Sequence, residues 1–427
     1  MTAAEASGFT VDVDLNPYLA EGATQVDAIV TVTGPPADVA APTSALEVIV
    51  VDCSSSMSGQ KIRAAQQAAS AAVGALRDGV SFAIVAGTQT ATQVFPEHGT
   101  AVADTESRAA AARAIATMRA NGGTGIGSWL QLTGQLAASS SAAVKHAILL
   151  TDGQNGETDR VFTRALESVT GAFVCDCRGV GTDWKVAELR RISSALLGTV
   201  DIVADPDDLA ADFAEIMNTS MGKTVSEVAL RMWVPRGGAV RFVKQVTPSM
   251  EDLTARRTDV SELVGDYPLG AWGAESRDYH VSVDVAPGGV QQKKLAARVT
   301  LVRAGSDEQL GTGMVVVEWT DDPALSTRIN RSVAVHTGQA ELAEAIQEGL
   351  AARKAGDEAR ATARLGRAAQ LADELGNEGT ARLLERVVDV VDAPSGTVRL
   401  RSGVSDADEM TLDTRSTKTV RVRPEGA

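Results

Sequence analysis

The chain of 427 residues is long enough for two or three domains, because a single domain usually holds roughly 100–200 residues. Apolar residues make up 44% of the sequence and charged residues 22%, as in folded globular proteins, which excludes a chain that is disordered throughout. The formal net charge of −15 argues against an extended nucleic-acid-binding surface, which needs clustered Lys and Arg, and it is compatible with protein partners and cations.

The first segment, residues 1–42, has the pattern of β-strands. FTVDVDLNPY and TQVDAIVTVTG alternate apolar and polar residues with a period of two. Two strands do not form an independent domain, so we expect them to pair with strands from elsewhere in the chain. The N-terminus has no basic region followed by an apolar one, and no apolar stretch approaches the ~20 residues of a transmembrane helix, so we expect neither a secretory signal nor a membrane span.

Residues 43–222 alternate short apolar runs with helical patterns. LEVIVVD is followed by KIRAAQQAASAAVGALRDG, HAILLTDG by RVFTRALESV, and AFVCDCRGVG by WKVAELRRISSALLG. Buried strands that alternate with helices are typical of a parallel sheet covered on both faces. We therefore predict a doubly wound, Rossmann-like α/β domain, in which ligands bind at the carboxyl ends of the strands.

The chain returns to strand patterns over residues 223–322 and changes again after them. Segments such as GAVRFVKQVTP and YHVSVDVAP predict the remainder of an antiparallel β-sandwich that begins in 1–42 and that the α/β domain interrupts. Residues 323–392 have apolar residues at helical spacing, with Gly356 and Gly376 as stop signals. They predict three helices, either as tetratricopeptide-type hairpins or as a plain bundle. Residues 393–427 show no sustained period, so we expect a flexible tail.

Five oxygen-bearing residues follow the predicted strands of the α/β domain. Asp52, Ser54 and Ser56 occur in DCSSSMSG, Thr124 occurs in NGGTGIGS, and Asp152 ends LLTD. Alternate positions of a loop face the same side, so the first three can share one hard cation such as Mg²⁺, which prefers oxygen ligands. The alternative is that these residues only cap strands and helices, with Ser56 or Ser58 capping the next helix.

These residues resemble the ligand set of a known family. DCSSS matches the D-x-S-x-S signature of von Willebrand factor A domains, and Thr124 and Asp152 occupy the places of its separate Thr and Asp. The resemblance covers residues 45 to about 220 and includes every segment of the metal-ion-dependent adhesion site. It implies that Ser54 and Ser56 bind Mg²⁺ directly, that Thr124 does so when a ligand is engaged, and that Asp52 and Asp152 act largely through water. Mn²⁺ is an alternative, since its oxygen preferences overlap.

The resemblance also implies a function. A cation held by neutral hydroxyls keeps most of its charge, so its free position can accept an Asp or Glu carboxylate of a partner protein. No general base is positioned by the sequence, so we expect a non-enzymatic scaffold of the bacterial intracellular type. A second reading is an accessory subunit of an AAA+ ATPase or chelatase-type machine. A surface adhesin is disfavoured because the signal and anchor are missing.

Other motifs give weaker signals. Cys53, Cys175 and Cys177 are an odd set, which argues against a disulfide framework and favours a reducing cytoplasm. Cys175 and Cys177 form C-x-C, which suits core packing better than a soft metal. GGTGIGS lacks the Lys of a phosphate-binding P-loop. His98, His146, His280 and His336 are scattered, so each is expected to be structural or exposed.

The last segment suggests a second mode of interaction. Thr411, Thr414, Thr417 and Thr419 lie where acidic residues give way to basic ones. A kinase that modified them would add about −1.5 to −2 charges each, and a phosphothreonine-reader domain could then bind the tail. The alternatives are a solvated tail and an additional strand formed by TKTVRVRP.

Overall fold

The structure, a computed structural model, describes residues 7–36 and 44–419. The chain divides into two compact units. One, the β-helical unit, comprises Met1–Val39 and Glu227–Ala427, and the other, the α/β unit, comprises Ala40–Ser226. The predicted boundary at 42–43 lies outside the described residues.

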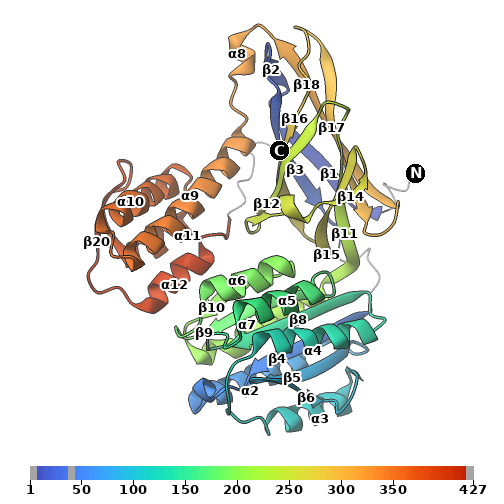
Figure 1. Cartoon of the computed structure of the whole chain (residues 1–427), viewed down its shortest axis with the longest axis vertical. Helices are drawn as coiled ribbons and strands as arrows, with labels where there is room; N and C mark the ends of the chain where they lie inside the picture. Colours follow the sequence, from blue (N-terminus) through green and yellow to red (C-terminus); the bar gives the residue numbers. More distant parts are fainter. Residues whose placement is uncertain (1–6, 37–43, 420–427) are drawn as a thin grey trace. The chain divides into compact units, whose positions relative to one another are not determined.

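A mixed sheet forms the centre of the α/β unit (Figure 1), with the strand order β10-β9-β8-β4-β5-β6. Its strands are β4 (Ala45–Asp52), β5 (Ser81–Gly87), β6 (Ala91–Phe95), β7 (Ala101–Val102), β8 (Val144–Thr151), β9 (Val174–Val180) and β10 (Val200–Val203). The strands β10, β9, β8, β4 and β5 are parallel, whereas β6 and β7 pair with β5 in the antiparallel sense. Every residue of β4 is buried, which explains its uninterrupted apolar run.

Helices cover the sheet in two groups. They are α2 (Gln60–Ala75), α3 (Thr105–Ile115), α4 (Ile126–Ser139), α5 (Asp159–Val169), α6 (Val186–Ala195) and α7 (Leu209–Met221). Two single 3₁₀ turns, Ser55–Met57 and Pro206–Asp208, complete the unit. Helix α2 contacts α3 and α7, and α5 contacts α4 and α6. Two such groups are expected where right-handed crossovers connect parallel strands, because these crossovers place helices on both faces of the sheet. The predicted Rossmann-like α/β fold with a parallel sheet is therefore confirmed.

Two further sheets belong to the β-helical unit. The first has the order β1-β3-β16-β12-β13 and the second β14-β15-β11-β17-β18-β2. Their strands are β1 (Thr10–Leu15), β2 (Tyr18–Ala20), β3 (Gln25–Thr33), β11 (Lys223–Trp233), β12 (Ala239–Thr247), β13 (Glu251–Asp252), β14 (Thr258–Ser261), β15 (Val264–Gly273), β16 (Ser276–Asp284), β17 (Lys293–Arg303) and β18 (Gln309–Thr320), with the 3₁₀ turn Thr254–Arg256.

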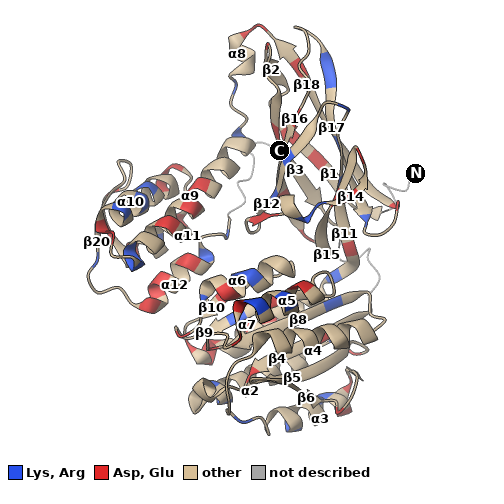
Figure 2. Ribbon diagram, viewed as in Figure 1, with Lys and Arg blue, Asp and Glu red and all other residues tan. Residues whose placement is uncertain are grey.

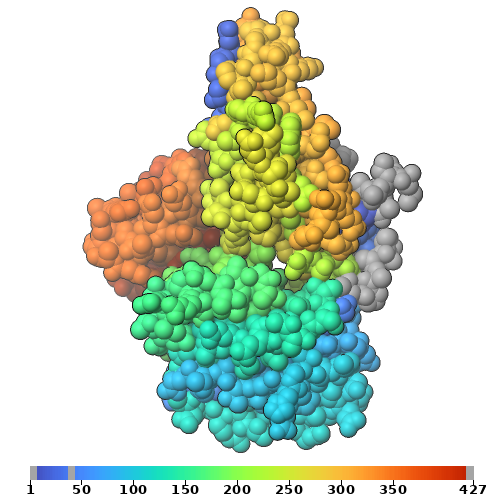
Figure 3. Space-filling model, turned by 45° about the vertical axis from the view of Figure 1, so that its right-hand side comes forward, coloured from blue at the N-terminus to red at the C-terminus, as the bar shows by residue number. Residues whose placement is uncertain are grey.

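Strands from both ends of the chain share these sheets. Strand β3 pairs with β16 along its whole length, from the pair Gln25 and Asp284 to the pair Thr33 and Ser276. Strand β2 pairs with β18, so blue and orange residues lie side by side in Figure 3. The N-terminal strands are thus completed by strands that follow residue 223.

The three predicted C-terminal helices are present as α9 (Arg331–Lys354), α10 (Glu358–Glu374) and α11 (Glu378–Val387). A single helical turn, α8 (Pro323–Ser326), precedes them and was not predicted. Gly356 and Gly376 follow α9 and α10 with φ of 76° and 62°, a conformation that glycine adopts without steric cost. Acidic residues of α9 face basic residues of α10 (Figure 2), and Arg367 pairs with Glu341 at 2.8 Å.

The expected flexible tail differs from the structure. Residues 393–419 contain part of the hairpin formed by β19 (Val388–Asp392) and β20 (Thr397–Leu400), and the helix α12 (Asp406–Arg415). Val398 and Leu412 are buried in the same apolar core as α9, α10 and α11. The sequence shows no sustained period here because the elements are short and contribute few apolar side chains. Residues 420–427 lie outside the described part of the chain.

Candidate metal centre

The predicted oxygen ligands lie at or directly after the carboxyl ends of strands in the parallel sheet. Strand β4 ends at Asp52, and its parallel neighbour β8 ends at Thr151, directly before Asp152. The carboxyl ends of parallel neighbours meet at one edge, so residues far apart in the sequence come together. Asp52 and Asp152 are completely buried, although a carboxylate is costly to remove from water.

Hydrogen bonds connect these side chains into one cluster. Ser54 donates its backbone N–H to Asp52 Oδ1 at 2.7 Å. Ser56 Oγ lies 2.9 Å from Ser54 Oγ and donates to Asp152 Oδ1 at 2.6 Å. Ser54 is buried, whereas Ser55 and Ser56 are both exposed, so burial does not alternate along the loop as its spacing predicts. Four of the five predicted ligands therefore form a continuous chain of contacts.

Gly153 shows that Thr124 belongs to the same cluster. A Cβ atom on Gly153 would lie 3.4 Å from Thr124 Oγ1, 3.5 Å from Ser56 Oγ and 4.0 Å from Asp52 Oδ2. Oxygens from three separate segments thus surround one point that the glycine leaves free.

Backbone hydrogen bonds fix the three loops to one another. Ser55 N–H donates to the carbonyl of Gly122, and Asn121 N–H donates to that of Cys53. Gly156 N–H donates to the Thr124 carbonyl at 2.7 Å. Because these bonds join all three ligand-bearing loops, the side-chain positions do not depend on side-chain contacts alone.

Burial determines the acidity of the groups beside the cluster. Burial raises the pKa of Asp52, although hydrogen bonds from Ser54 and Thr151 act in the opposite direction. Burial and then the charge of Asp52 raise the pKa of the Cys53 thiol to about 12, so this thiol is not a nucleophile at neutral pH. Cys53 is a packing residue, as expected.

Two members of the cluster were not predicted. Thr151 Oγ1 donates to Asp52 Oδ2 at 2.5 Å. Lys61 Nζ, in the first turn of α2, donates to Asp152 Oδ2 at 2.5 Å and lies 3.6 Å from Asp183 Oδ2. Thr151 is adjacent to Asp152 in the sequence, and this was a usable signal. Lys61 and Asp152 are 91 residues apart, so only the fold brings them together.

The helix-capping alternative is wrong for these serines. The N-cap of α2 is Gly59, without a side-chain hydrogen bond, and Ser58 Oγ donates to the Ser55 carbonyl instead. The 3₁₀ turn that starts at Ser55 likewise has no side-chain cap from Ser54. The hydroxyls of Ser54 and Ser56 therefore face the carboxylates rather than a helix end.

The donor set fits a hard divalent cation. It consists of two carboxylates and three hydroxyls, and Mg²⁺ and Mn²⁺ prefer such oxygen ligands. The position that Gly153 leaves free is bordered by three of these oxygens, from Thr124, Ser56 and Asp52, which is the environment a small cation needs. Within 7–36 and 44–419, no group of three or more His, Cys, Asp or Glu side chains suits a metal, so serine and threonine oxygens are required for a site in this part.

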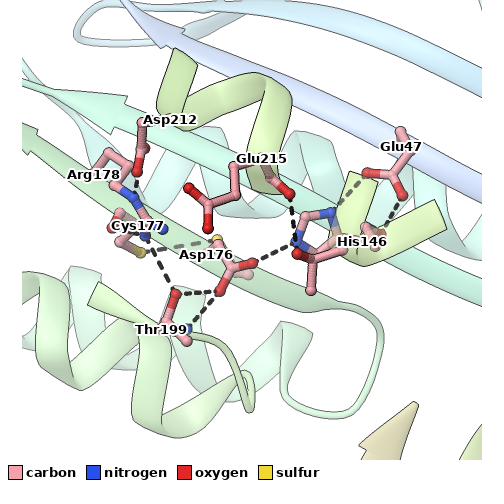
Figure 4. A network of polar contacts seen from close by, with 11 residues as sticks. Glu47, His146, Asp176, Cys177, Arg178, Thr199, Asp212 and Glu215 are labelled. Carbon is pink, nitrogen blue, oxygen red and sulfur yellow. Dashed lines mark hydrogen bonds and ion pairs between the residues drawn. The ribbon is translucent and has the colours of Figure 1, made fainter. Parts of the chain in front are cut away.

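A second polar cluster lies at the start of the central strands (Figure 4), where His146 of β8 lies between two carboxylates. Its Nδ1 is 2.7 Å from Glu47 Oε2, and its Nε2 is 3.0 Å from Asp176 Oδ2. Ser220 of α7 donates to Glu47 Oε1. Burial alone would lower the pKa of His146, but the charge of Glu47 and hydrogen bonds with both carboxylates raise it to about 10. The two carboxylates thus favour the charged form of His146, and their contacts join β4, β8 and β9.

The cysteine pair behaves as predicted for core packing. Cys175 and Cys177 are buried on β9, and their sulfurs are 4.0 Å apart without a disulfide. Of the other histidines, His98 is exposed, and His280 lies 3.1 Å from Asp27 through Nε2.

The four predicted phosphorylation sites occupy different environments. Thr411 and Thr414 are buried on α12, and their hydroxyls donate to the carbonyls of Ala407 and Met410. Thr417 and Thr419 are half-buried. Burial of the first two hydroxyls opposes their modification in the folded chain, whereas phosphorylation of the last two stays a prediction.

In the part of the chain that the structure describes, no helix combines the length and apolarity needed to cross a lipid bilayer.

Two family models match the chain. The von Willebrand factor type A domain matches residues 47–202, which hold the oxygen cluster. The von Willebrand factor type A C-terminal domain matches residues 370–416, including most of the segment expected to be a flexible tail.

Comparisons with individual proteins extend this similarity. The chain is 48% identical to a solved von Willebrand factor type A structure from Catenulispora acidiphila, over 97% of this chain and 98% of that one, with a TM-score of 0.93. The ArnB paralog VWA2 from Sulfolobus acidocaldarius is 14% identical with a TM-score of 0.61 over 96% of this chain and 97% of that one, which shows the fold alone. An uncharacterised Synechocystis protein is 27% identical over 223 residues, and the match spans 51% of this chain and 52% of that protein.

Proposed function

The chain belongs to the von Willebrand factor type A family, and we propose that it is a non-enzymatic interaction module that binds an acidic side chain of a partner protein through Mg²⁺. Domains of this family are generally protein-interaction modules. The observation that supports the proposal is that oxygens of Asp52, Ser56 and Thr124 border the point that Gly153 leaves free, with the Ser54 hydroxyl 2.9 Å from that of Ser56.

Each residue of the cluster has a separate task in this proposal. Ser54 and Ser56 would hold the cation directly, and Thr124 would join them when a ligand is bound. Asp52 and Asp152 would act through water, and their existing hydrogen bonds orient both carboxylates. A cation bound here supplies a positively charged coordination position that a partner's Asp or Glu carboxylate can fill.

The architecture supports a scaffold role. We infer that the α/β unit is an insertion into a β-sandwich, because β3 and β16, on either side of it in the sequence, are paired along their length. The three cysteines are free and buried, which supports a reducing compartment such as the cytoplasm.

Affinity purification from the host with and without EDTA tests this function. We expect partners that the wild-type chain retains only without EDTA, and that Asp52→Ala and Thr124→Ala lose. Ser55→Ala is the matched control, because Ser55 lies between two proposed ligands without being one of them, so its loss should leave binding unchanged. An identical set of partners with and without EDTA would refute the metal-dependent mechanism. An AAA+ ATPase among the EDTA-sensitive partners would identify the accessory-subunit role.

A further inference from the structure

Lys61 introduces a positive charge into the oxygen cluster. Its ammonium donates to Asp152 Oδ2 at 2.5 Å, while Ser56 occupies the other oxygen of the same carboxylate. Asp152 is fully buried and the Lys61 side chain is 27% exposed, so the ion pair spans from the interior to the surface. The ammonium of Lys61 thus offsets the free-energy cost of burying the Asp152 carboxylate.

The two carboxylates of the cluster accept hydrogen bonds from donors of different charge. Asp52 receives neutral donors, the Ser54 N–H and the Thr151 O–H. Asp152 receives an ammonium. The second neighbour of Lys61, Asp183, is 74% exposed and lies 3.6 Å away, so water screens most of its effect.

A count of formal charges shows the consequence of this arrangement. With Lys61 present, the two carboxylates and one ammonium leave one net negative charge, and a divalent cation changes this to one net positive charge. Without the ammonium, the same loaded site would be formally neutral. Charges a few ångströms apart in a partly buried site interact strongly, so this single charge matters to any anionic ligand.

We propose that Lys61 determines the ligand selectivity of the metal centre by weakening its affinity for the cation and strengthening the affinity of the loaded site for a carboxylate. This inference rests on the proposed function and deepens it, because it assigns the preference for an acidic partner to one residue outside the metal ligands. By linkage, the anionic ligand and the cation then increase each other's affinity.

Lys61→Met in the full-length chain tests the inference, since Met keeps an unbranched side chain and removes the charge. In a calorimetric titration with Mg²⁺ alone, the variant should bind Mg²⁺ at least about tenfold more tightly than the wild type. Titration of the Mn²⁺-loaded chain with acetate, followed by water proton relaxation, should show about tenfold weaker acetate binding. The opposite signs matter, because a residue with a purely structural role would weaken both.

Two further variants complete the experiment. Lys61→Gln, which can still donate to Asp152, should behave as Lys61→Met does, and it serves if the Met variant does not fold. Arg63→Met removes an exposed charge from the same helix and should leave both affinities unchanged.

The outcomes separate the two proposals. If the wild type binds no Mg²⁺, the proposed function fails and this inference fails with it. If the wild type binds Mg²⁺ but both neutral variants bind it equally or more weakly, only the role of Lys61 is refuted. Acetate binding that is unchanged in both variants would likewise overturn it.

Discussion

Two serines separated by one residue provide neutral oxygens to the proposed metal centre. Ser54 and Ser56 have hydroxyls 2.9 Å apart, and that of Ser56 donates to Asp152, although both Ser55 and Ser56 are exposed. The backbone is extended at Ser54 and turns directly after it. Side-chain contacts, not burial, therefore distinguish the proposed ligand Ser56 from its neighbour Ser55.

Removing one of these hydroxyls should weaken cation binding. We expect Ser54→Ala or Ser56→Ala to reduce Mg²⁺ affinity about tenfold or more, because each removes a proposed direct ligand. Asp152→Asn should reduce it by about 10–100-fold, the range observed when groups that orient metal ligands are lost. Isothermal titration calorimetry measures these constants, with Ser55→Ala as the control. Equal affinities in Ser54→Ala and Ser55→Ala would contradict the ligand assignment.

The buried His146 should make stability depend on pH. Its folded pKa of about 10 lies above the ordinary 6.5, so its contribution is complete below pH 6.5 and is lost as pH rises toward 10. Hydrogen bonds and charge from His146 outweigh burial and lower the pKa of Asp176, whose contribution is complete above its ordinary 3.8 and is lost as pH falls below that value. We therefore expect the greatest stabilisation from this pair between about pH 4 and 6.5.

His146→Gln should remove this stabilisation. It leaves Glu47 and Asp176 without their shared cation, and breaking a buried ion pair typically costs about 3–5 kcal/mol. Urea denaturation of the full chain at several pH values measures this loss in the unfolding free energy of the α/β unit. An unfolding free energy that is unchanged by His146→Gln at pH 6 would show that the buried charges do not stabilise the fold.

At the scale of the elements, strands were predictable where their apolar runs were long. β4 and β8 are buried along nearly their whole length, and their sequences show it. The short strands β6 and β7 are mostly half-buried and carry no clear pattern, so the antiparallel edge of the sheet was missed. The candidate ligands were predictable because each directly follows a strand or lies in a glycine-rich loop. The ion pair of Lys61 was not, since it depends on a contact between distant elements.

Helix α12 was not predicted from the sequence for a different reason. Its start carries a recognisable signal, because Ser405 accepts a hydrogen bond from Asp408 N–H and acidic residues fill the first turn. The apolar period is weak, since two of the four buried side chains of the helix are threonines. A local capping signal was therefore available, but the burial of Leu412 depends on α9, α10 and α11.

Leu412→Ala tests whether this segment is part of the folded core. The side chain is fully buried, so we expect a loss of about 2–5 kcal/mol in the unfolding free energy of the β-helical unit. Val391→Ala, on the exposed side of β19, is the control and should cost less than about 0.5 kcal/mol. If both variants unfold like the wild type in chemical denaturation, the tail is flexible after all.

The whole molecule consists of two units with separate cores, and the proposed cation site lies entirely in one of them. A ligand stabilises only the unit whose folded state binds it. Calorimetric unfolding should therefore show two transitions, and saturating Mg²⁺ should raise the midpoint temperature of only one of them. At a concentration about 100 times the dissociation constant, the gain is about 2.7 kcal/mol. Ser56→Ala should abolish the shift, and a shift of both transitions would contradict a site confined to the α/β unit.

The central claim is that the oxygens after β4 and β8 bind a divalent cation together with Thr124. Crystals of the full chain grown with Mn²⁺ and measured for anomalous scattering test it most directly. The account predicts one peak bordered by Ser54 Oγ, Ser56 Oγ and the space in front of Gly153, at the distances of about 2.0–2.3 Å expected for oxygen ligands of such cations. A peak elsewhere, or no peak at this edge of the sheet at saturating Mn²⁺, would contradict it.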